Sequence, residues 1–445
     1  MSNQAHSRKL TRRAFLRLGG AGVLALLGGS ALSTSAGHLD QARAASAAMP
    51  LAAPPPVTIH LAATDGHILL PGRGSPSGGG AGAPLYIFGF VRVPVGAPPN
   101  ALDVYTGNVQ FTAPIIGVDQ EADVYLTMTN IGFAVRPDLD DAHTIHWHGF
   151  PNATAIFDGV PEVSISVPPG RDFPYYYKPH RAGTFIYHCH FEDVEHVQMG
   201  MRGIIYVRPS QNGSSLGGFT KFTYNDGDGA TGYNREFVLL CDELWTTPHD
   251  NGESIQETIW PDYRANYWVI NGRSYPDTVL PNNDPSLPTQ PISALIQANP
   301  GDRVLLRIAN LGYEQHALHL PGIQLKVVGE DAALLRNGTV DLSYLTNTIY
   351  VGPGEARDAL FTAPAFDGAA PVFTDSIGNY NRYYFKNASP HKLTNDGQVD
   401  PTTGLGGMVT EVRVYQGSPL AAQLHPNQTY PEFAPPPPYL DPWIV

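Results

Sequence analysis

The chain has 445 residues, which is enough for two or three domains, and a formal net charge of −13. This acidic balance excludes nucleic acid and anionic lipid as expected partners. Two cysteines are too few for a disulfide framework, and Cys241, in the apolar run VLLCDELW, is expected to be a buried free thiol. Abundant Gly and Pro, with only 15% charged residues, favour a β-rich fold with many turns.

Residues 1–44 have the features of an export signal. Residues 11–17 read TRRAFLR, a twin-arginine motif, and an apolar run follows at 18–27. The sequence ARA at 42–44 is a small-residue cleavage site. Removal of this segment would take away six Lys or Arg residues and one Asp, which changes the net charge from −13 to −18. We therefore expect export by the twin-arginine route to the periplasm, the cell surface or the medium, with no membrane anchor in the mature protein.

The rest of the chain contains an internal repeat. Residues 124–132 (VYLTMTNIG) match residues 304–312 (VLLRIANLG), and VPPG at 167–170 matches VGPG at 351–354. Apolar or alternating runs that end in a turn signal are typical of sandwich strands, so we predict an all-β fold of two antiparallel β-sandwiches. The predicted segments are an N-terminal extension at 45–84 with a Gly-rich loop at 75–83, a first domain at 85–210, a linker at 211–234, a second domain at 235–416 and an extended proline-rich tail at 417–445.

Two histidine-rich stretches of the first predicted domain carry the chemistry. Residues 187–201 read YHCHFEDVEHVQMGM, and residues 143–149 read HTIHWHG. A trigonal set of two imidazoles and one thiolate, with a weak axial thioether, is what a blue-copper electron-transfer site requires. Since Cys189 is the one cysteine among these histidines, the sequence predicts such a site here.

Strand geometry divides the candidate ligands into two groups. Successive side chains of a strand point to opposite faces, so Cys189 faces away from His188 and His190. The same parity separates His143 from His146 and His148. The first predicted group comprises His143, Cys189, His196 and Met201, and the second, all-imidazole group comprises His146, His148, His188 and His190. Because Cys189 is bonded to two members of the second group, an electron at the first site would have a short covalent path to the second.

These stretches resemble the copper-ligand signatures of the multicopper oxidases, the laccase-like enzymes built from cupredoxin domains. The resemblance covers most of residues 80–415. It implies two cupredoxin-like Greek-key sandwiches that bind copper, with a type 1 ion at the first group and one or more type 2 or type 3 ions at the second. The family's usual second type 1 histidine follows the cysteine by five residues, where this chain has Val194, and His196 lies two residues further on. A longer loop with a methionine ligand is similar to that of the copper nitrite reductases.

The second repeat keeps few of these residues. HTIHWHG aligns with HALHLPG at 316–322, where His316 and His319 survive and Pro321 replaces the third histidine. YHCH is best matched by FTDS at 373–376, which has neither a thiolate nor an imidazole, so we expect no type 1 copper in the second domain. The family's oxygen-reducing cluster uses eight histidines; four come from the first domain, and His316 and His319 would raise the count to six. His391 is expected to be a solvated loop residue.

The resemblance implies an exported copper oxidase. A phenol or a low-valent metal ion would lose one electron at a time near His196, and dioxygen would be reduced to water at the imidazole group. The loop carboxylates Glu192, Asp193 and Glu195 would either steer cationic substrates or simply solvate the loop. In two-domain relatives the second copper site lies between domain 1 of one subunit and domain 2 of the next, which implies a head-to-tail homotrimer.

Two alternatives stay open at this stage. A nitrite reductase-like enzyme would need only one further copper ion, but such enzymes use a carboxylate between their first two domain 1 histidines, where this chain has His146. The missing domain 2 ligands also allow a non-enzymatic copper-binding or electron-transfer protein whose cluster has decayed.

Overall fold

The computed structural model describes residues 53–74, 82–150 and 154–445. The predicted export signal at 1–44 and most of the Gly-rich loop at 75–83 lie outside the described residues. Among those that are described, no helix has the length and apolar character needed to cross a membrane.

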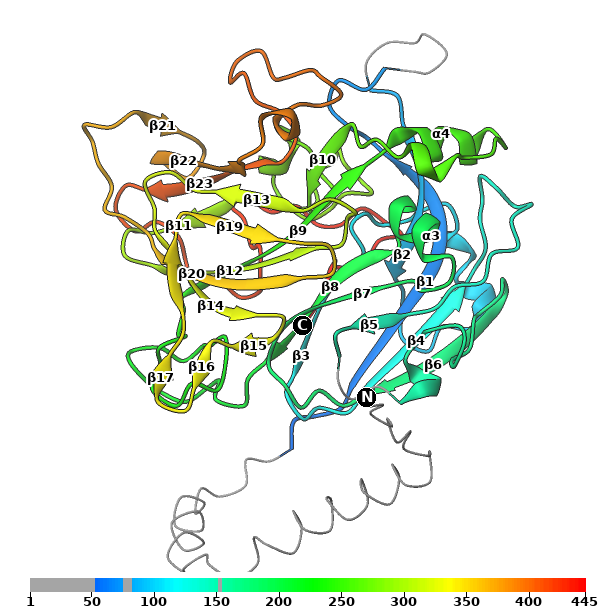
Figure 1. The fold of residues 1–445 in the computed structure, drawn as a ribbon, viewed down its shortest axis with the longest axis horizontal. Coiled ribbons are helices and arrows are strands. Elements are labelled where there is room, and N and C mark those ends of the chain that lie inside the picture. The colour runs from blue at the N-terminus through cyan, green and yellow to red at the C-terminus, as the bar shows by residue number, and fades with distance from the viewer. Residues whose placement is uncertain (1–52, 75–81, 151–153) are drawn as a thin grey trace, which may run out of the picture. The chain divides into compact units, whose positions relative to one another are not determined.

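Two sheets form the first sandwich (Figure 1). One has four strands in the order β2-β1-β4-β6, and the other has five in the order β24-β3-β8-β7-β5. Their bounds are β1 (Val57–Ile68), β2 (Leu85–Arg92), β3 (Ile115–Asp119), β4 (Val124–Asn130), β5 (His146–His148), β6 (Arg171–Tyr177), β7 (Gly183–His188), β8 (Arg202–Arg208) and β24 (Trp443–Ile444). The inward side chains of both sheets, among them Leu61, Phe88 and Trp147, form one buried apolar core.

The second sandwich repeats this plan with more strands. Its first sheet has seven strands, ordered β10-β9-β12-β20-β14-β15 with β18 beside β14, and its second has six, ordered β11-β23-β22-β13-β19 with β21 beside β22; β16 and β17 form a separate pair. Their bounds are β9 (Arg235–Leu244), β10 (Tyr267–Ile270), β11 (Ile296–Ala298), β12 (Arg303–Asn310), β13 (His316–His319), β14 (Leu325–Glu330), β15 (Ala333–Leu334), β16 (Arg336–Asn337), β17 (Val340–Asp341), β18 (Tyr344–Thr346), β19 (Thr348–Val351), β20 (Ala356–Thr362), β21 (Val372–Thr374), β22 (Asn379–Asn387) and β23 (Val409–Tyr415). The predicted all-β fold of two sandwiches is therefore confirmed.

Two short α-helices and several 3₁₀ turns complete the described chain: α3 (Asp193–Met199), α4 (Thr246–Glu253), η1 (Pro99–Ala101), η2 (Asp103–Tyr105), η3 (Ala155–Phe157), η4 (Trp260–Asp262), η5 (Asp277–Val279) and η6 (Pro390–Leu393). Helix α3 ends at Gly200, whose φ of 128° suits glycine. A Cβ at Gly200 would lie 2.8 Å from the carbonyl oxygen of Phe88, so glycine is needed for the close approach of α3 to β2.

The first domain begins earlier than predicted. The expected start at residue 85 is wrong, because β1 lies between β2 and β4 in the first sheet. Val57 of β1 pairs with Val124 of β4 in the way that Arg235 of β9 pairs with Val304 of β12, so β1 is the counterpart of β9 in the repeat. Most side chains of β1 are buried, polar as well as apolar. Residues 57–61 (VTIHL) nevertheless alternate between apolar and polar side chains, so the strand had a signal in the sequence that the predicted boundary overlooked.

The proline-rich tail joins the two sandwiches, which belong to one compact unit, Pro54–Val445. Its last strand, β24, pairs in parallel with β3 through Trp443 and Ile115. Earlier in the tail, the side chains of Gln423 and Asn427 accept hydrogen bonds of 2.7 Å from main-chain N–H groups of β9. Trp443 belongs to an apolar cluster that also contains buried residues of both sandwiches, so the tail stabilises the contact between them.

Buried polar pairs fix the two sandwiches further. Arg202 of β8 faces Asp242 of β9 at 3.0 Å, and both side chains are fully buried. The hydroxyl of Thr184 in β7 donates a 2.6 Å hydrogen bond to Asp358 of β20. Such pairs are costly to break one partner at a time, so they hold the sandwiches in one arrangement.

The contact made by the tail can be tested with Trp443→Ala. Loss of this nearly buried side chain is expected to lower the free energy of unfolding by about 3–5 kcal/mol, the usual cost of removing a buried tryptophan. Leu424→Ala is the matched control in the same tail, because Leu424 is 83% exposed and its loss should change stability by less than about 0.5 kcal/mol. Urea unfolding measures both, and equal effects would contradict a structural role for the tail.

Candidate metal centre

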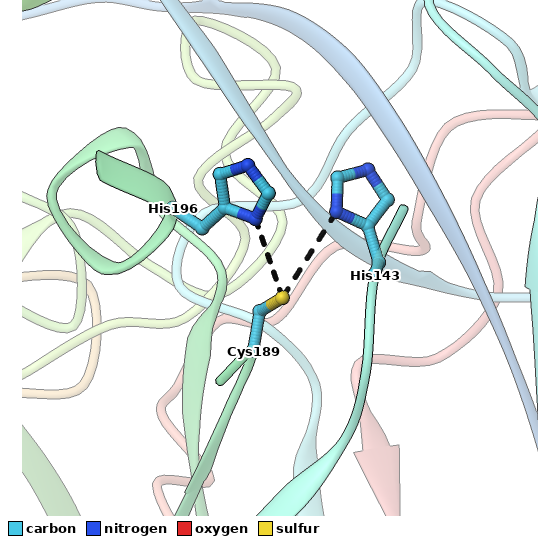
Figure 2. A group of neighbouring side chains, drawn as sticks. All are labelled: His143, Cys189 and His196. Carbon is cyan, nitrogen blue, oxygen red and sulfur yellow. Dashed lines mark hydrogen bonds between the residues drawn. The ribbon is translucent and has the colours of Figure 1, made fainter. Parts of the chain in front are cut away.

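His143, Cys189 and His196 meet in the core of the first sandwich (Figure 2). The Sγ of Cys189 lies 3.3 Å from Nδ1 of His196 and 4.0 Å from Nδ1 of His143. One ligand atom of each residue lies within 4.8 Å of the others, and none of the three side chains is exposed to solvent. The structure thus brings together three of the four residues predicted for the first group.

Main-chain hydrogen bonds hold each of these positions. His143 exchanges two hydrogen bonds with Val167, of 3.0 and 2.9 Å. Cys189 directly follows β7 and donates its N–H to the carbonyl oxygen of Met201 at 3.0 Å. His196 lies on α3, and its carbonyl oxygen accepts the N–H of Met201 at 2.9 Å. Met201, the fourth predicted residue, is therefore tied to both Cys189 and His196, and it is fully buried.

The electrostatics of this group fit a cation. Burial raises the pKa of the Cys189 thiol to about 12, lowers the pKa of His196 to about 4 and holds the pKa of His143 well below its ordinary value. Neutral imidazoles are the metal-binding form, and a bound metal ion deprotonates a coordinating thiol outright. The Thr144 N–H also points at the sulfur at 3.4 Å, as a thiolate would require. Two neutral nitrogens and a dry sulfur are the donors that copper selects.

The imidazole group lies beside it. Strand β5 pairs with β7 so that His146 is directly opposite His188, which places both side chains on one face. Ligand atoms of His146, His148 and His188 lie within 4.8 Å of one another. The ring centroid of His190 is 5.2 Å from that of His146 and 5.6 Å from that of His188. The structure therefore places all four predicted histidines together, with three of them close enough to share one ion.

Hydrogen bonds select the metal-binding nitrogens of this group. Nδ1 of His146 donates to the carbonyl oxygen of Asp158 at 2.6 Å, and Nδ1 of His188 donates to that of Cys189 at 2.7 Å. Each bond fixes the tautomer and leaves Nε2 free for a metal. Burial lowers the pKa of His188 to about 3, so its ring stays neutral. This donor set also fits copper.

A cavity of about 280 Å³ opens between the sandwiches at the imidazole group. His148, His188 and His190 line it from one side, and residues 311–313, 353 and 354 line it from the other. A Cβ at Gly354 would lie 3.0 Å from Nε2 of His148, so the glycine lets the VGPG turn of the second sandwich approach the ring. The sequence marked this turn only as part of the repeat, because nothing local shows what it will pack against.

Two carboxylates approach the outer edge of His196. The Oε2 of Glu192 lies 4.0 Å from Nε2 of His196, and Asp141 joins them in a group whose ligand atoms lie within 4.8 Å of one another. That Nε2 is buried and has no hydrogen-bond partner. Of the three loop carboxylates considered from the sequence, Glu192 is the one in this group. Asp141 was missed, although its place two residues before His143 was the available signal.

The second domain corrects one predicted alignment. His319 of β13 pairs with Lys386 of β22, as His146 pairs with His188, so the counterpart of YHCH is FKNA at 385–388. The predicted match to FTDS at 373–376 is wrong. Those residues lie on and after the edge strand β21, not on the central strand β22. The alignment had relied on the similarity of a short polar segment, because strand register cannot be read from the sequence. FKNA also contains no thiolate or imidazole.

The two remaining histidines of the second domain differ in character. His316 is fully buried, and its Nε2 lies 3.0 Å from a carboxylate oxygen of Glu243. This nitrogen is therefore already paired with a protein group. His319 is only partly buried, and its Nδ1 bonds to the Thr348 hydroxyl at 2.9 Å, which leaves Nε2 free. Neither belongs to a potential metal-binding group of the described residues.

Two further expectations from the sequence are confirmed. Cys241 is a buried free thiol, and His391 is exposed.

The fold and the two donor groups define a copper-binding protein of the cupredoxin class, and comparison with known proteins agrees. Two sequence profiles described as multicopper oxidase match residues 96–212 and 235–381, which together exceed half of the chain. This chain belongs to the multicopper oxidase family, so the predicted family and its copper cofactor are confirmed.

Individual relatives are distant. Laccase-1 of Cryptococcus neoformans is 24% identical, over 58% of this chain and 38% of that protein, and the iron transport multicopper oxidase FET3 of Saccharomyces cerevisiae is 24% identical, over 55% and 33%. The chain thus spans less than two fifths of these curated relatives. Among solved structures, the blue copper oxidase from Nitrosomonas europaea has a similar fold (23% identity, TM-score 0.57, covering 81% of this chain and 86% of that one).

Cys189→Ser tests the first donor group. Because serine offers no thiolate, this variant is expected to lose the blue absorption of the copper-loaded protein and one copper ion per chain. Visible absorption and metal analysis measure the two losses. Cys241→Ser is the matched control, since Cys241 is equally buried but lies in β9 of the second sandwich, and it should keep the colour. A blue Cys189→Ser protein would refute the role of Cys189.

Proposed function

We propose that this chain is an exported oxidase that couples one-electron oxidation of a small substrate at the first group to reduction of dioxygen at the imidazole group. The position of Cys189 carries the proposal, because its side chain belongs to the first group and its two neighbours belong to the second. Copper, when bound, supplies the redox chemistry by accepting single electrons and passing them to dioxygen. Export stays a prediction from the twin-arginine motif, which N-terminal sequencing of the exported protein would check.

The first group is proposed to hold the type 1 ion. His143, Cys189 and His196 would hold it, and the Met201 thioether would be a weaker fourth donor. Aromatic rings pack against both histidines. The ring centroid of Phe88 lies 5.4 Å from that of His196, edge-on, and the ring centroid of Phe133 lies 5.6 Å from that of His143. An apolar shell of this kind excludes water and tunes the potential of the site.

The chain itself supplies two routes between the groups. Cys189 leads to His190 through covalent bonds alone. His188 returns to the same peptide by donating its Nδ1–H to the Cys189 carbonyl oxygen at 2.7 Å. Short bonded routes favour rapid electron transfer, so the sequence order of these three residues supports the proposed coupling.

A low-valent metal cation is the substrate class that the site favours over a phenol. The His196 ring is fully buried, so a substrate cannot rest against it. Its outer nitrogen instead faces the group formed with Asp141 and Glu192, whose oxygens are ligands suited to a hard cation. The relative named as an iron transport multicopper oxidase supports the same choice.

We further propose that a neighbouring subunit completes the oxygen-reducing cluster in a head-to-tail homotrimer. His319 has a free Nε2 and lies on β13 beside β19, where Tyr350 is 67% exposed. Exposed apolar residues gather in the adjoining segment, namely Val340, Leu342 and Leu345. The first domain also exposes apolar residues in the segment around Asp158, the hydrogen-bond partner of His146, namely Ile156, Val163 and Ile165. Two different apolar patches on one chain can close a ring if each covers the other on the next subunit.

Copper content, mass and oxygen uptake test the oxidase. The copper-loaded protein is expected to hold three or four copper ions per chain, to have the mass of three chains in light scattering, and to consume dioxygen with a reducing metal ion such as Fe²⁺. Two ions per chain with turnover of nitrite would instead indicate a nitrite reductase-like enzyme. One blue ion without oxygen uptake would contradict both enzymes, and a monomeric mass would contradict the trimer.

Asp141→Asn combined with Glu192→Gln tests the substrate class. Loss of two negative charges beside His196 is expected to raise the KM for Fe²⁺ at least about tenfold, a change of about 1.4 kcal/mol, while the KM for a neutral phenol stays the same. Steady-state kinetics with both substrates measure this. Asp140→Asn is the matched control, because Asp140 is the exposed neighbour outside the group. Equal changes for iron and phenol would contradict a cation site.

A further inference from the structure

The second sandwich contains four residues at the positions that correspond to the first donor group. Strand register identifies the first of them. Since His319 pairs with Lys386 as His146 pairs with His188, the residue after Lys386, Asn387, corresponds to Cys189. Both residues stand at the end of a strand in the middle of a sheet, so the correspondence does not depend on sequence similarity.

Main-chain hydrogen bonds identify two more. The Asn387 N–H donates to the carbonyl oxygen of Met408 at 2.9 Å, just as the Cys189 N–H donates to that of Met201 at 3.0 Å. Met408 therefore corresponds to Met201. His316 pairs with Val351 of the VGPG turn as His143 pairs with Val167 of the VPPG turn, so His316 corresponds to His143.

Lys392 takes the place of the second histidine. It lies five residues after Asn387, the spacing that the multicopper oxidases usually place between the cysteine and this histidine. It belongs to η6, in the loop between β22 and β23, as His196 belongs to α3 between β7 and β8. Its side chain turns inward and is 5% exposed.

Three contacts link the four side chains in the core of the second sandwich. Nδ1 of His316 lies 3.4 Å from Nδ2 of Asn387 and 3.4 Å from Nζ of Lys392. Nδ2 of Asn387 lies 3.3 Å from the sulfur of Met408. All four residues are buried, and Nδ1 of His316 faces its neighbours as Nδ1 of His143 faces Cys189.

The Lys392 ammonium brings a positive charge into this group. Nζ lies 2.6 Å from a carboxylate oxygen of Glu314 and donates to the carbonyl oxygen of Gln315 at 2.8 Å. On the far side of the His316 ring, Nε2 is paired with Glu243 at 3.0 Å. The group therefore has a cation and nearby anions without any metal.

We infer that His316, Asn387, Lys392 and Met408 are a former type 1 copper site in which the ammonium group of Lys392 replaces the metal ion. The inference rests on the assignment of His143, Cys189, His196 and Met201 as type 1 ligands. Two of the four donors, an imidazole and a thioether, are still present. Asn387→Cys and Lys392→His supply the other two and remove the competing charge, so this pair of substitutions restores copper binding. A cavity of about 720 Å³ lined by His316 and Lys392 gives the ion an entry path.

The test uses the full chain with Cys189→Ser, which removes the blue colour of the first domain. Adding Asn387→Cys and Lys392→His to this variant is expected to restore blue absorption and to raise the copper content by one ion per chain. The control adds Ser389→Cys and Lys392→His to the same Cys189→Ser variant. Its new thiol lies two residues from position 387, so this protein should stay colourless. A triple variant that is folded by circular dichroism but binds no additional copper, or binds it without blue colour, would overturn the former copper site.

Lys392→Met gives a second, independent measurement should the triple variant fail to fold. Loss of the ammonium removes the ion pair with Glu314, which keeps only the Trp268 indole N–H, and removes the hydrogen bond to the Gln315 carbonyl oxygen. The melting temperature is therefore expected to fall by about 5 °C or more. Lys386→Met is the matched control in strand β22, where the lysine is only partly buried, and it should change the melting temperature by less than about 2 °C. Equal melting temperatures for the two variants would overturn the role of Lys392 as the replacement cation.

The Cys189→Ser variant separates failure of this inference from failure of the type 1 assignment on which it rests. If Cys189→Ser keeps its blue colour, the type 1 assignment is refuted.

Discussion

The alternation of side chains at the end of β7 is the constraint on which the rest of the structure depends. Because neighbouring side chains of an extended chain face opposite ways, Cys189 enters the sandwich core while His188 and His190 face the cavity between the sandwiches. One peptide segment thereby belongs to two donor groups. A shift of register by a single residue would exchange the faces and destroy both groups, which explains why the neighbouring strands hold this segment with main-chain hydrogen bonds on both sides.

Burial gives the first group its chemical character. A thiol and two imidazoles in a dry apolar core are neutral, and a neutral imidazole is the form that binds a metal ion. Between the sandwiches, Arg202 and Asp242 form an ion pair of their own, with Nε and Oδ1 3.0 Å apart. This buried pair of opposite charges therefore lies at the contact between β8 and β9.

The two sandwiches show how one backbone supports different chemistry. Asn130 and Asn310 each donate a side-chain hydrogen bond to the carbonyl oxygen of the valine that opens the following turn, at 3.0 and 3.1 Å. Pairing, turns and main-chain bonds recur, so the positions of potential ligands recur as well. The side chains at these positions differ: an amide stands where the first domain has a thiol, and an ammonium where it has an imidazole. The second domain keeps the frame of a metal site while its own lysine provides the charge.

The sequence by itself determined the fold class, the two-domain repeat and the division of the first domain's histidines and Cys189 into two groups. Short segments suffice for this, because they contain both the local periodicity and the donor chemistry of His and Cys. Contacts across long sequence separations were decided only by the tertiary structure. Strand β1 begins with an alternating run, VTIHL at 57–61, but its place between β2 and β4 depends on pairing with distant segments. Asp141 and Gly354 approach His196 and His148 only after the chain folds. The counterpart of YHCH in the second domain was likewise set by strand register, because a strand is aligned by its hydrogen-bonded neighbours and not by resemblance between its letters.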